Sequence, residues 1–94
     1  MNKYQSVFIV NPSVEDDKVK ALIQKFSDLI NNDGKVLEVE EKGKVKLAYE
    51  VKKNPEGYFN VITFEANPTV VSELERVYRI TDEVIKFITT RVND

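Results

Sequence analysis

The spacing of apolar residues alternates along this chain between the period of a strand and the period of a helix. Residues 4–10 (YQSVFIV) form a strand-like run that ends at Asn11-Pro12, a turn dipeptide whose proline has no amide donor for a sheet. Residues 58–66 and 84–91 are two further strand segments. Two stretches between these strands repeat apolar residues at i, i+3 and i+4, which predicts amphipathic helices.

The first predicted helix follows Asn11-Pro12, with Ser13 as its N-cap and Gly34 free to end it in the left-handed conformation. Its apolar face is formed by Val19, Leu22, Ile23, Phe26 and Ile30. The second predicted helix follows Asn67 as N-cap, with Pro68 in its first turn. Its buried stripe is formed by Val70, Val71, Leu74, Val77 and Tyr78.

Between the helices, a strand pattern runs from Val36 to Val51. Its apolar residues hold odd positions on both sides of Gly43: Leu37, Val39, Val45, Leu47, Tyr49 and Val51. A two-residue turn at Lys42-Gly43 would mix lysine into the apolar face, so we expect a single long strand that is bent or bulged near Gly43. A three-residue loop would also keep the parity and ranks second. The segment Asn54-Pro55-Glu56-Gly57 predicts the turn into the next strand.

The resulting order, β-α-β-β-α-β, predicts an α+β fold. With right-handed crossovers it gives the ferredoxin-like split β-α-β-β-α-β sandwich, a four-stranded antiparallel sheet with two helices on one face. The chain has 94 residues, 41% of them hydrophobic, so we expect one domain over residues 1–94. The longest apolar run covers only residues 7–10 and the N-terminus has no signal layout, so a cytosolic protein is expected.

The residue inventory argues against an enzyme. The sequence contains no Cys and no His, which excludes thiolate nucleophiles and imidazole chemistry. The acidic runs at residues 15–17 and 38–41 fit a helix N-terminus and a solvated strand face. The three glycines are scattered and form no phosphate-binding loop. We therefore expect no catalytic residue, no cofactor and no metal site.

A local excess of lysine is the strongest sign of a binding surface. Residues 42–53 carry five lysines and one acid, a local charge of +4 in a chain whose net charge is −2. Such a patch suits phosphate contacts, but lysines also guard exposed strands against aggregation, and alternation alone does not separate the two. Residues 57–64 (GYFNVITF) superficially resemble the aromatic strand of an RNA-recognition motif, but Asn60 and Ile62 break the match, and core packing is expected for these rings.

Several segments together resemble one family. They are Tyr4, Asn11-Pro12, KGKVKLAYEV around Gly43, Gly57-Tyr58-Phe59 and RITDEVIKFITTR from Arg79 to Arg91. In this order and spacing they are similar to the bacterial small-subunit ribosomal protein number six family, over essentially the whole chain. The resemblance implies a ferredoxin-like domain that binds the central domain of small-subunit ribosomal RNA as a heterodimer with ribosomal protein number eighteen.

The resemblance also implies RNA-binding residues. The family places basic residues where Lys3, Lys86 and Arg91 stand, and Tyr4 opens the first strand beside Lys3. Lys44 and Lys46 are assigned a supporting electrostatic role. The chain departs from the family at Glu50, where many relatives have proline, and at residues 45–46, where many have arginine. We therefore expect weak RNA binding without the partner protein.

Two other functions share this fold. One is a protein-interaction or small-ligand regulatory module that does not bind RNA, because fold does not fix function. The other is an acylphosphatase-like enzyme, which would need an arginine after the first strand, where NPSVEDD offers only acids. Neither small-molecule substrate nor membrane is an expected partner.

Overall fold

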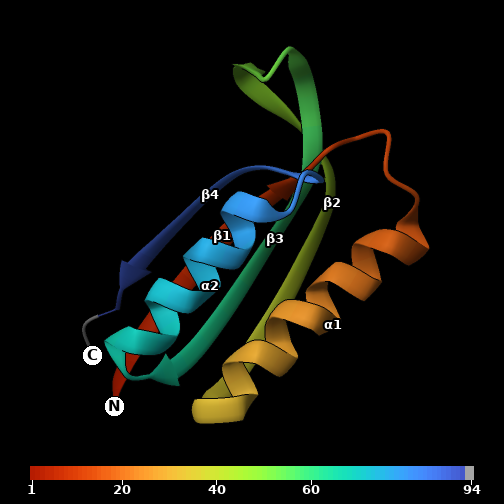
Figure 1. Ribbon diagram of the computed structural model, residues 1–94. Coiled ribbons are helices and arrows are strands. Elements are labelled where there is room, and N and C mark those ends of the chain that lie inside the picture. Colours follow the sequence, from red (N-terminus) through yellow and green to blue (C-terminus); the bar gives the residue numbers. More distant parts are fainter. Residues whose placement is uncertain (93–94) are drawn as a thin grey trace.

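Four strands and two helices alternate in the computed structural model, which describes residues 1–92 (Figure 1). The elements are β1 (Asn2–Val10), α1 (Asp16–Asp33), β2 (Lys35–Val51), β3 (Asn54–Ala66), α2 (Pro68–Ile80) and β4 (Val84–Arg91). Residues 93 and 94, the end of the predicted domain, lie outside the described residues. The predicted bounds of β4 are confirmed, and β1 begins two residues before the predicted Tyr4.

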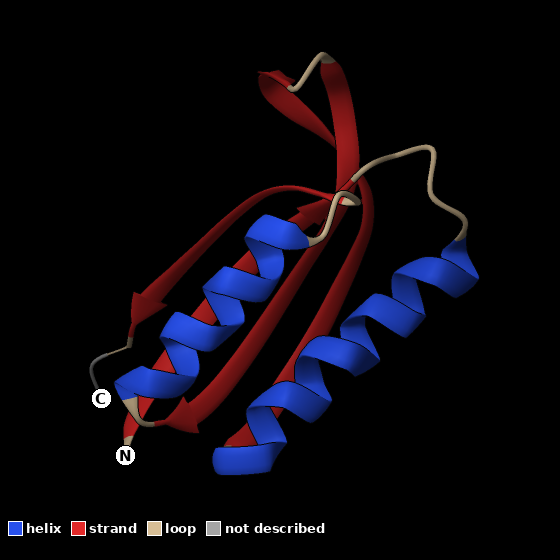
Figure 2. Cartoon of the chain, in the orientation of Figure 1, coloured by secondary structure: helices blue, strands red, loops and turns tan. Residues whose placement is uncertain are grey.

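The strands form one sheet in the order β2-β3-β1-β4, and each neighbouring pair is antiparallel. Both helices cover the same face of this sheet (Figure 2). This arrangement is the predicted ferredoxin-like sandwich. It leaves the other side of the sheet without a helix, and we call that side the open face.

The hydrophobic core lies between the helices and the even-numbered residues of β1 and β3. Phe8, Phe26, Phe64 and Leu74 are fully buried there. Tyr78 packs edge-on against Phe26, with ring centroids 4.7 Å apart. Burial raises the pKa of Tyr78 above its usual range, and the hydroxyl shares a 2.8 Å hydrogen bond with Ser6 Oγ that partly offsets the shift. The predicted burial of Leu22, Phe26 and Leu74 is confirmed.

The ends of α1 differ from the predicted ends. Ser13 is not the N-cap, because it lies in a turn where its amide and its hydroxyl both donate to Asn11 Oδ1, at 2.9 and 2.8 Å. Glu15 holds the N-cap position and makes no side-chain cap bond. Gly34 is extended instead of left-handed, with φ −158°. Glycine is needed there for space, since a Cβ would lie 2.5 Å from the carbonyl oxygen of Glu65.

A bulge at Gly43 changes the face to which the β2 side chains point. Glu41 pairs with Asn60 and Lys44 pairs with Tyr58, so β2 carries one extra residue between these pairs. Gly43 takes φ +75°, a conformation that favours glycine. The single bulged strand is confirmed, but the prediction that its odd residues share one face is wrong. One inserted residue reverses the alternation, so Val45, which pairs with Gly57, lies on the open face.

The turn between β2 and β3 also lies elsewhere than predicted. Lys52 and Lys53 form it, with φ of 48° and 67°, and Val51 pairs with Asn54 across it. Two positive φ values are typical of the type I′ turn that joins tightly paired strands. The side chain of Asn54 donates to the carbonyl oxygens of Val51 and Lys52, at 3.3 and 3.2 Å. The predicted turn at residues 54–57 is wrong, because these residues already belong to β3.

The bulge also explains why the predicted burial of Leu47 is wrong. Leu47 is half-buried on the open face, away from the core.

The different burial of Phe26 and Leu47 predicts different losses of stability. We expect Phe26→Ala to lower the free energy of unfolding by about 3–5 kcal/mol, because Phe26 is fully buried in the core. Leu47→Ala should lower it by less than about 1.5 kcal/mol, because less apolar area leaves water there on folding. Urea denaturation checks both values, and equal losses would show that Leu47 belongs to the core.

Candidate functional site

The open face is built from the odd-numbered residues of β1 and β3 and the even-numbered residues of β4. In the register of the sheet, Val7 lies opposite Val61 and Ile88, and Ile9 lies opposite Phe59 and Lys86. The same alternation turns Phe8 and Phe87 toward the helices. This side of the sheet therefore presents apolar residues together with the ammonium group of Lys86.

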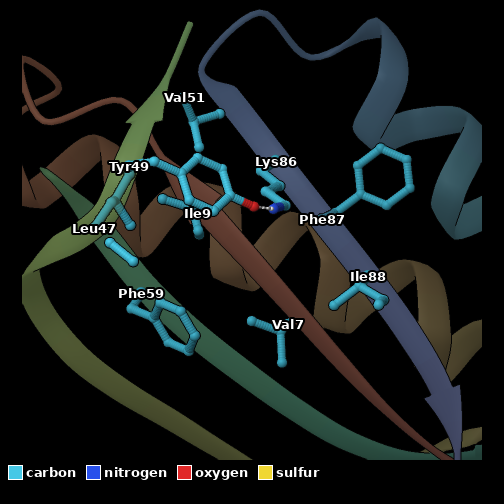
Figure 3. A pocket seen from close by; sticks show the side chains of 10 residues that line it. Val7, Ile9, Leu47, Tyr49, Val51, Phe59, Lys86, Phe87 and Ile88 are labelled. Carbon is cyan, nitrogen blue, oxygen red and sulfur yellow. Dashed lines mark hydrogen bonds between the residues drawn. The ribbon is translucent and has the colours of Figure 1, made fainter. Parts of the chain in front are cut away.

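Beyond the bulge, β2 and β3 form a two-stranded arm, residues 44–57, that extends past the helices (Figure 1). Its β2 strand bends across the open face and encloses a pocket of about 270 Å³ (Figure 3). The pocket is lined mainly by the apolar side chains of Val7, Ile9, Leu47, Val51, Phe59 and Ile88. Reversal of the alternation at Gly43 brings Leu47 to this side, and Val51 follows a second irregularity in the pairing, between Lys46 and Val51.

Tyr49 and Lys86 meet at the rim of the pocket (Figure 3). Lys86 Nζ donates a 2.9 Å hydrogen bond to the Tyr49 hydroxyl and lies 5.1 Å from the ring centroid. Lys86 therefore contacts Tyr49 both through the hydroxyl and through its charge near the ring. This bond and the positive charge of Lys86 lower the pKa of Tyr49.

The three basic residues that the family resemblance implies as RNA contacts do not share one surface. Lys86 lies on the open face, and Lys3 lies on the same face at the far end of β1, opposite Glu65. Arg91 pairs with Tyr4, so its side chain leaves the sheet on the helix side, where it donates to Asn2 Oδ1 at 3.0 Å.

Lys44 and Lys46 lie on the helix side of the arm. Lys44 Nζ is 5.4 Å from the ring centroid of Tyr58, and Lys46 pairs with Glu56. Both lysines therefore point away from Lys86 and Tyr49. Val45 and Leu47, which alternate with these lysines, lie on the open face.

Tyr4 is a packing residue. Its side chain is only 9% exposed, and its ring centroid lies 5.6 Å from that of Phe64. The hydroxyl accepts a hydrogen bond from Asn2 Nδ2 at 3.4 Å. The predicted contact of Tyr4 with RNA stays a prediction. Because most of the side chain is buried, only the hydroxyl end is available for such a contact.

Tyr49 is the site residue that sequence reasoning missed. It is 66% exposed, whereas the other aromatic side chains within residues 1–92 are buried or half-buried. The LAY triplet after Gly43 contained a sign of this residue, because an aromatic side chain on an alternating strand either packs in the core or is exposed to solvent. The triplet alone does not show on which face of the sheet Tyr49 lies, since that face depends on the bulge.

Within residues 1–92, no cluster of three or more His, Cys, Asp or Glu residues could hold a metal ion. Neither α1 nor α2 is long and apolar enough to cross a membrane. The chemistry available at the open face is apolar packing, aromatic stacking and binding of an anion by an ammonium group.

Comparison with known proteins shows the family of this chain. The family model described as Ribosomal protein S6 matches residues 3–91. The chain belongs to this family. Members of the S6 family are proteins of the small ribosomal subunit, which functions in the bacterial cytoplasm, and the family is not an enzyme family.

Individual relatives agree with this placement. The small ribosomal subunit protein bS6 of Clostridium kluyveri is 51% identical over 89 residues, covering 94% of this chain and 94% of its own. The bS6 protein of Moorella thermoacetica is 40% identical over 95 aligned positions, covering 100% of this chain and 97% of its own. The crystal structure of 30S ribosomal protein S6 from Thermotoga maritima superposes with a TM-score of 0.92 at 36% identity, covering 97% and 87% of the two chains. The family indicated by the sequence is therefore confirmed.

The Tyr49–Lys86 pair predicts a measurable titration. Lys86→Met should raise the pKa of Tyr49 toward its ordinary value, because the mutant loses both the hydrogen bond and the positive charge. NMR titration of the tyrosine ring carbons reports this pKa, and the Tyr49 signal is assigned by its absence in Tyr49→Phe.

Lys44→Met is the matched control for that titration. It removes a lysine beside Tyr58 on the other side of the arm and should leave the pKa of Tyr49 unchanged. An unaltered Tyr49 pKa in Lys86→Met would contradict the contact.

Proposed function

We propose that this chain is a structural constituent of the small ribosomal subunit that binds the central domain of its ribosomal RNA together with ribosomal protein number eighteen. The observation that carries the proposal is the S6 family match over residues 3–91. The fold supports it, since the relative from Thermotoga maritima is a 30S ribosomal protein with a TM-score of 0.92 to this chain. We also propose that residues 1–94 act as one domain.

The charge distribution supports a local RNA contact that depends on a partner. The net charge is −2, so the chain as a whole does not attract phosphate, whereas residues 42–53 carry +4. We propose Lys86, Lys3 and Arg91 as contacts to phosphate, Lys44 and Lys46 as electrostatic support, and Tyr4 through its hydroxyl end. Lys86 and Arg91 lie on opposite sides of β4, which is an edge strand of the sheet, and this placement suits an RNA that passes around that edge.

One observation favours a second function. The apolar pocket on the open face would also suit a protein-interaction or small-ligand module that binds no RNA. The two functions differ in salt dependence, because release of counterions makes RNA binding fall steeply with salt, while apolar binding does not.

Filter binding tests the proposed function directly. Alone, the protein should bind arbitrary RNA poorly, because its net charge is negative. With ribosomal protein number eighteen it should bind a fragment of the central domain of small-subunit ribosomal RNA. Tight, partner-independent binding to arbitrary RNA would contradict this account, and so would failure to bind the fragment with the partner present.

Individual cations can be tested by their effect on the salt dependence. Lys86→Ala and Arg91→Ala should leave the free energy of unfolding within about 0.5 kcal/mol, because both side chains are exposed. Each should make the slope of log affinity against log salt shallower by roughly 0.7–0.9, the value for one lost phosphate contact.

Lys20→Ala is the control for these variants. Lys20 is exposed on α1, on the helix side of the sheet, whereas its neighbour Lys18 lies 3.8 Å from Glu83 and is a poorer control. A changed slope in Lys20→Ala, with none in Lys86→Ala and Arg91→Ala, would move the RNA surface to the helices.

A further inference from the structure

Tyr49 is exposed in a way that packing does not explain. Its side chain is 66% accessible, although a tyrosine on a strand usually covers apolar neighbours. Leu47 and Val51, two positions to either side, are half-buried against the pocket on the same face. Tyr49 thus lies between two packed residues and still presents much of its ring to solvent.

The ring is nevertheless held in one place. The hydroxyl is fixed by the 2.9 Å hydrogen bond from Lys86, a residue 37 positions away on β4. The side chain also lines the pocket next to Ile9 (Figure 3). A ring fixed before binding loses little conformational entropy when a ligand packs on it.

The chemistry of the pair matches a nucleotide. A flat aromatic ring that faces solvent can stack on a base of any sequence. An ammonium group has three donors, so Lys86 can keep its bond to Tyr49 and still donate to a phosphate. On β1, the residue paired with Lys86 is Ile9, so no acidic side chain lies directly opposite Lys86 in this pair of strands.

We propose that Tyr49 and Lys86 form a subsite for one unpaired nucleotide of RNA, with the base stacked on the Tyr49 ring and its phosphate bound by Lys86. This inference rests on the proposed RNA-binding function and adds a residue and a mode of recognition to it. Base stacking makes the subsite selective for single-stranded RNA over a continuous duplex, whose bases are already stacked.

Three variants at Tyr49 and Lys86 separate the two halves of the subsite. Tyr49→Phe keeps the stacking face and should change the affinity for the central-domain fragment, in the presence of ribosomal protein number eighteen, by less than about twofold. Tyr49→Leu keeps apolar volume but removes the aromatic face, and should weaken binding by about 5- to 100-fold. Lys86→Met should weaken binding and make the salt slope shallower by roughly 0.7, the single-strand value.

Tyr58→Leu is the matched control. Tyr58 is half-buried and has a lysine near its ring, but it lies on the helix side of the arm. After correction for any loss of folded protein, its effect on RNA affinity should be less than about twofold, because a ring on that side has no role in stacking.

A binding measurement without RNA separates a nucleotide subsite from a protein contact. Tyr49→Leu should bind ribosomal protein number eighteen as tightly as the unchanged protein does. If Tyr49→Leu weakens that binding by the same factor as RNA binding, the ring is a protein contact and the subsite is overturned. Equal RNA affinities for Tyr49→Leu and Tyr49→Phe would also overturn it, while the proposed function would stand. If the unchanged protein fails to bind RNA with its partner, the proposed function fails and the subsite fails with it.

Discussion

The extra residue at Gly43 is the constraint on which the open face depends. Side chains alternate between the two faces of a strand, so one inserted residue exchanges the faces for every residue that follows. Before the bulge Val39 pairs with the buried Ile62, and after it Val45 pairs with Gly57 on the open face. Gly43 takes φ +75°, which a residue with a side chain adopts only at a cost. The bulge and a second irregularity in the pairing between Lys46 and Val51 together let β2 line the pocket with Leu47, Tyr49 and Val51.

The two faces of the sheet differ in what they bury and what they leave accessible. On the helix side, the buried polar atoms are paired: Thr89 Oγ1 donates to Ser6 Oγ at 3.0 Å, and Ser6 shares a hydrogen bond with Tyr78. No buried side-chain N or O atom within residues 1–92 lacks a partner. On the open face, apolar and cationic groups stay accessible. β4 serves both faces, because Phe87 contacts the ring of Tyr78 while Lys86 reaches Tyr49.

Most of the fold could be predicted from hydrophobic period, and most of the site could not. The helical repeats and the strand at residues 84–91 were enough to predict the element order, because the period of the apolar residues shows which residues share one side of a helix or strand. The period does not show whether that side points toward the helices or toward the open face of the sheet. The same odd parity on both sides of Gly43 concealed the exchange of faces, and only pairing with β3 reveals it.

The position of the turn between β2 and β3 could not be predicted either. Asn54-Pro55-Glu56-Gly57 has the composition of a turn, yet Lys52 and Lys53 form the turn, in a backbone conformation that lysine seldom adopts. Tyr49 was missed because its partner Lys86 is remote in sequence.

The central claim is that RNA binds this protein on the open face, at the end where the arm meets β4. NMR cross-saturation in the complex with the central-domain fragment and ribosomal protein number eighteen tests it most directly, since protons of the RNA transfer saturation only to nearby protein groups. We expect the largest transfer at Tyr49, Lys86 and Ile88, and little at exposed positions of α1 such as Lys20 and Asp28. Transfer concentrated on α1 and α2, with none at Tyr49 or Lys86, would contradict it.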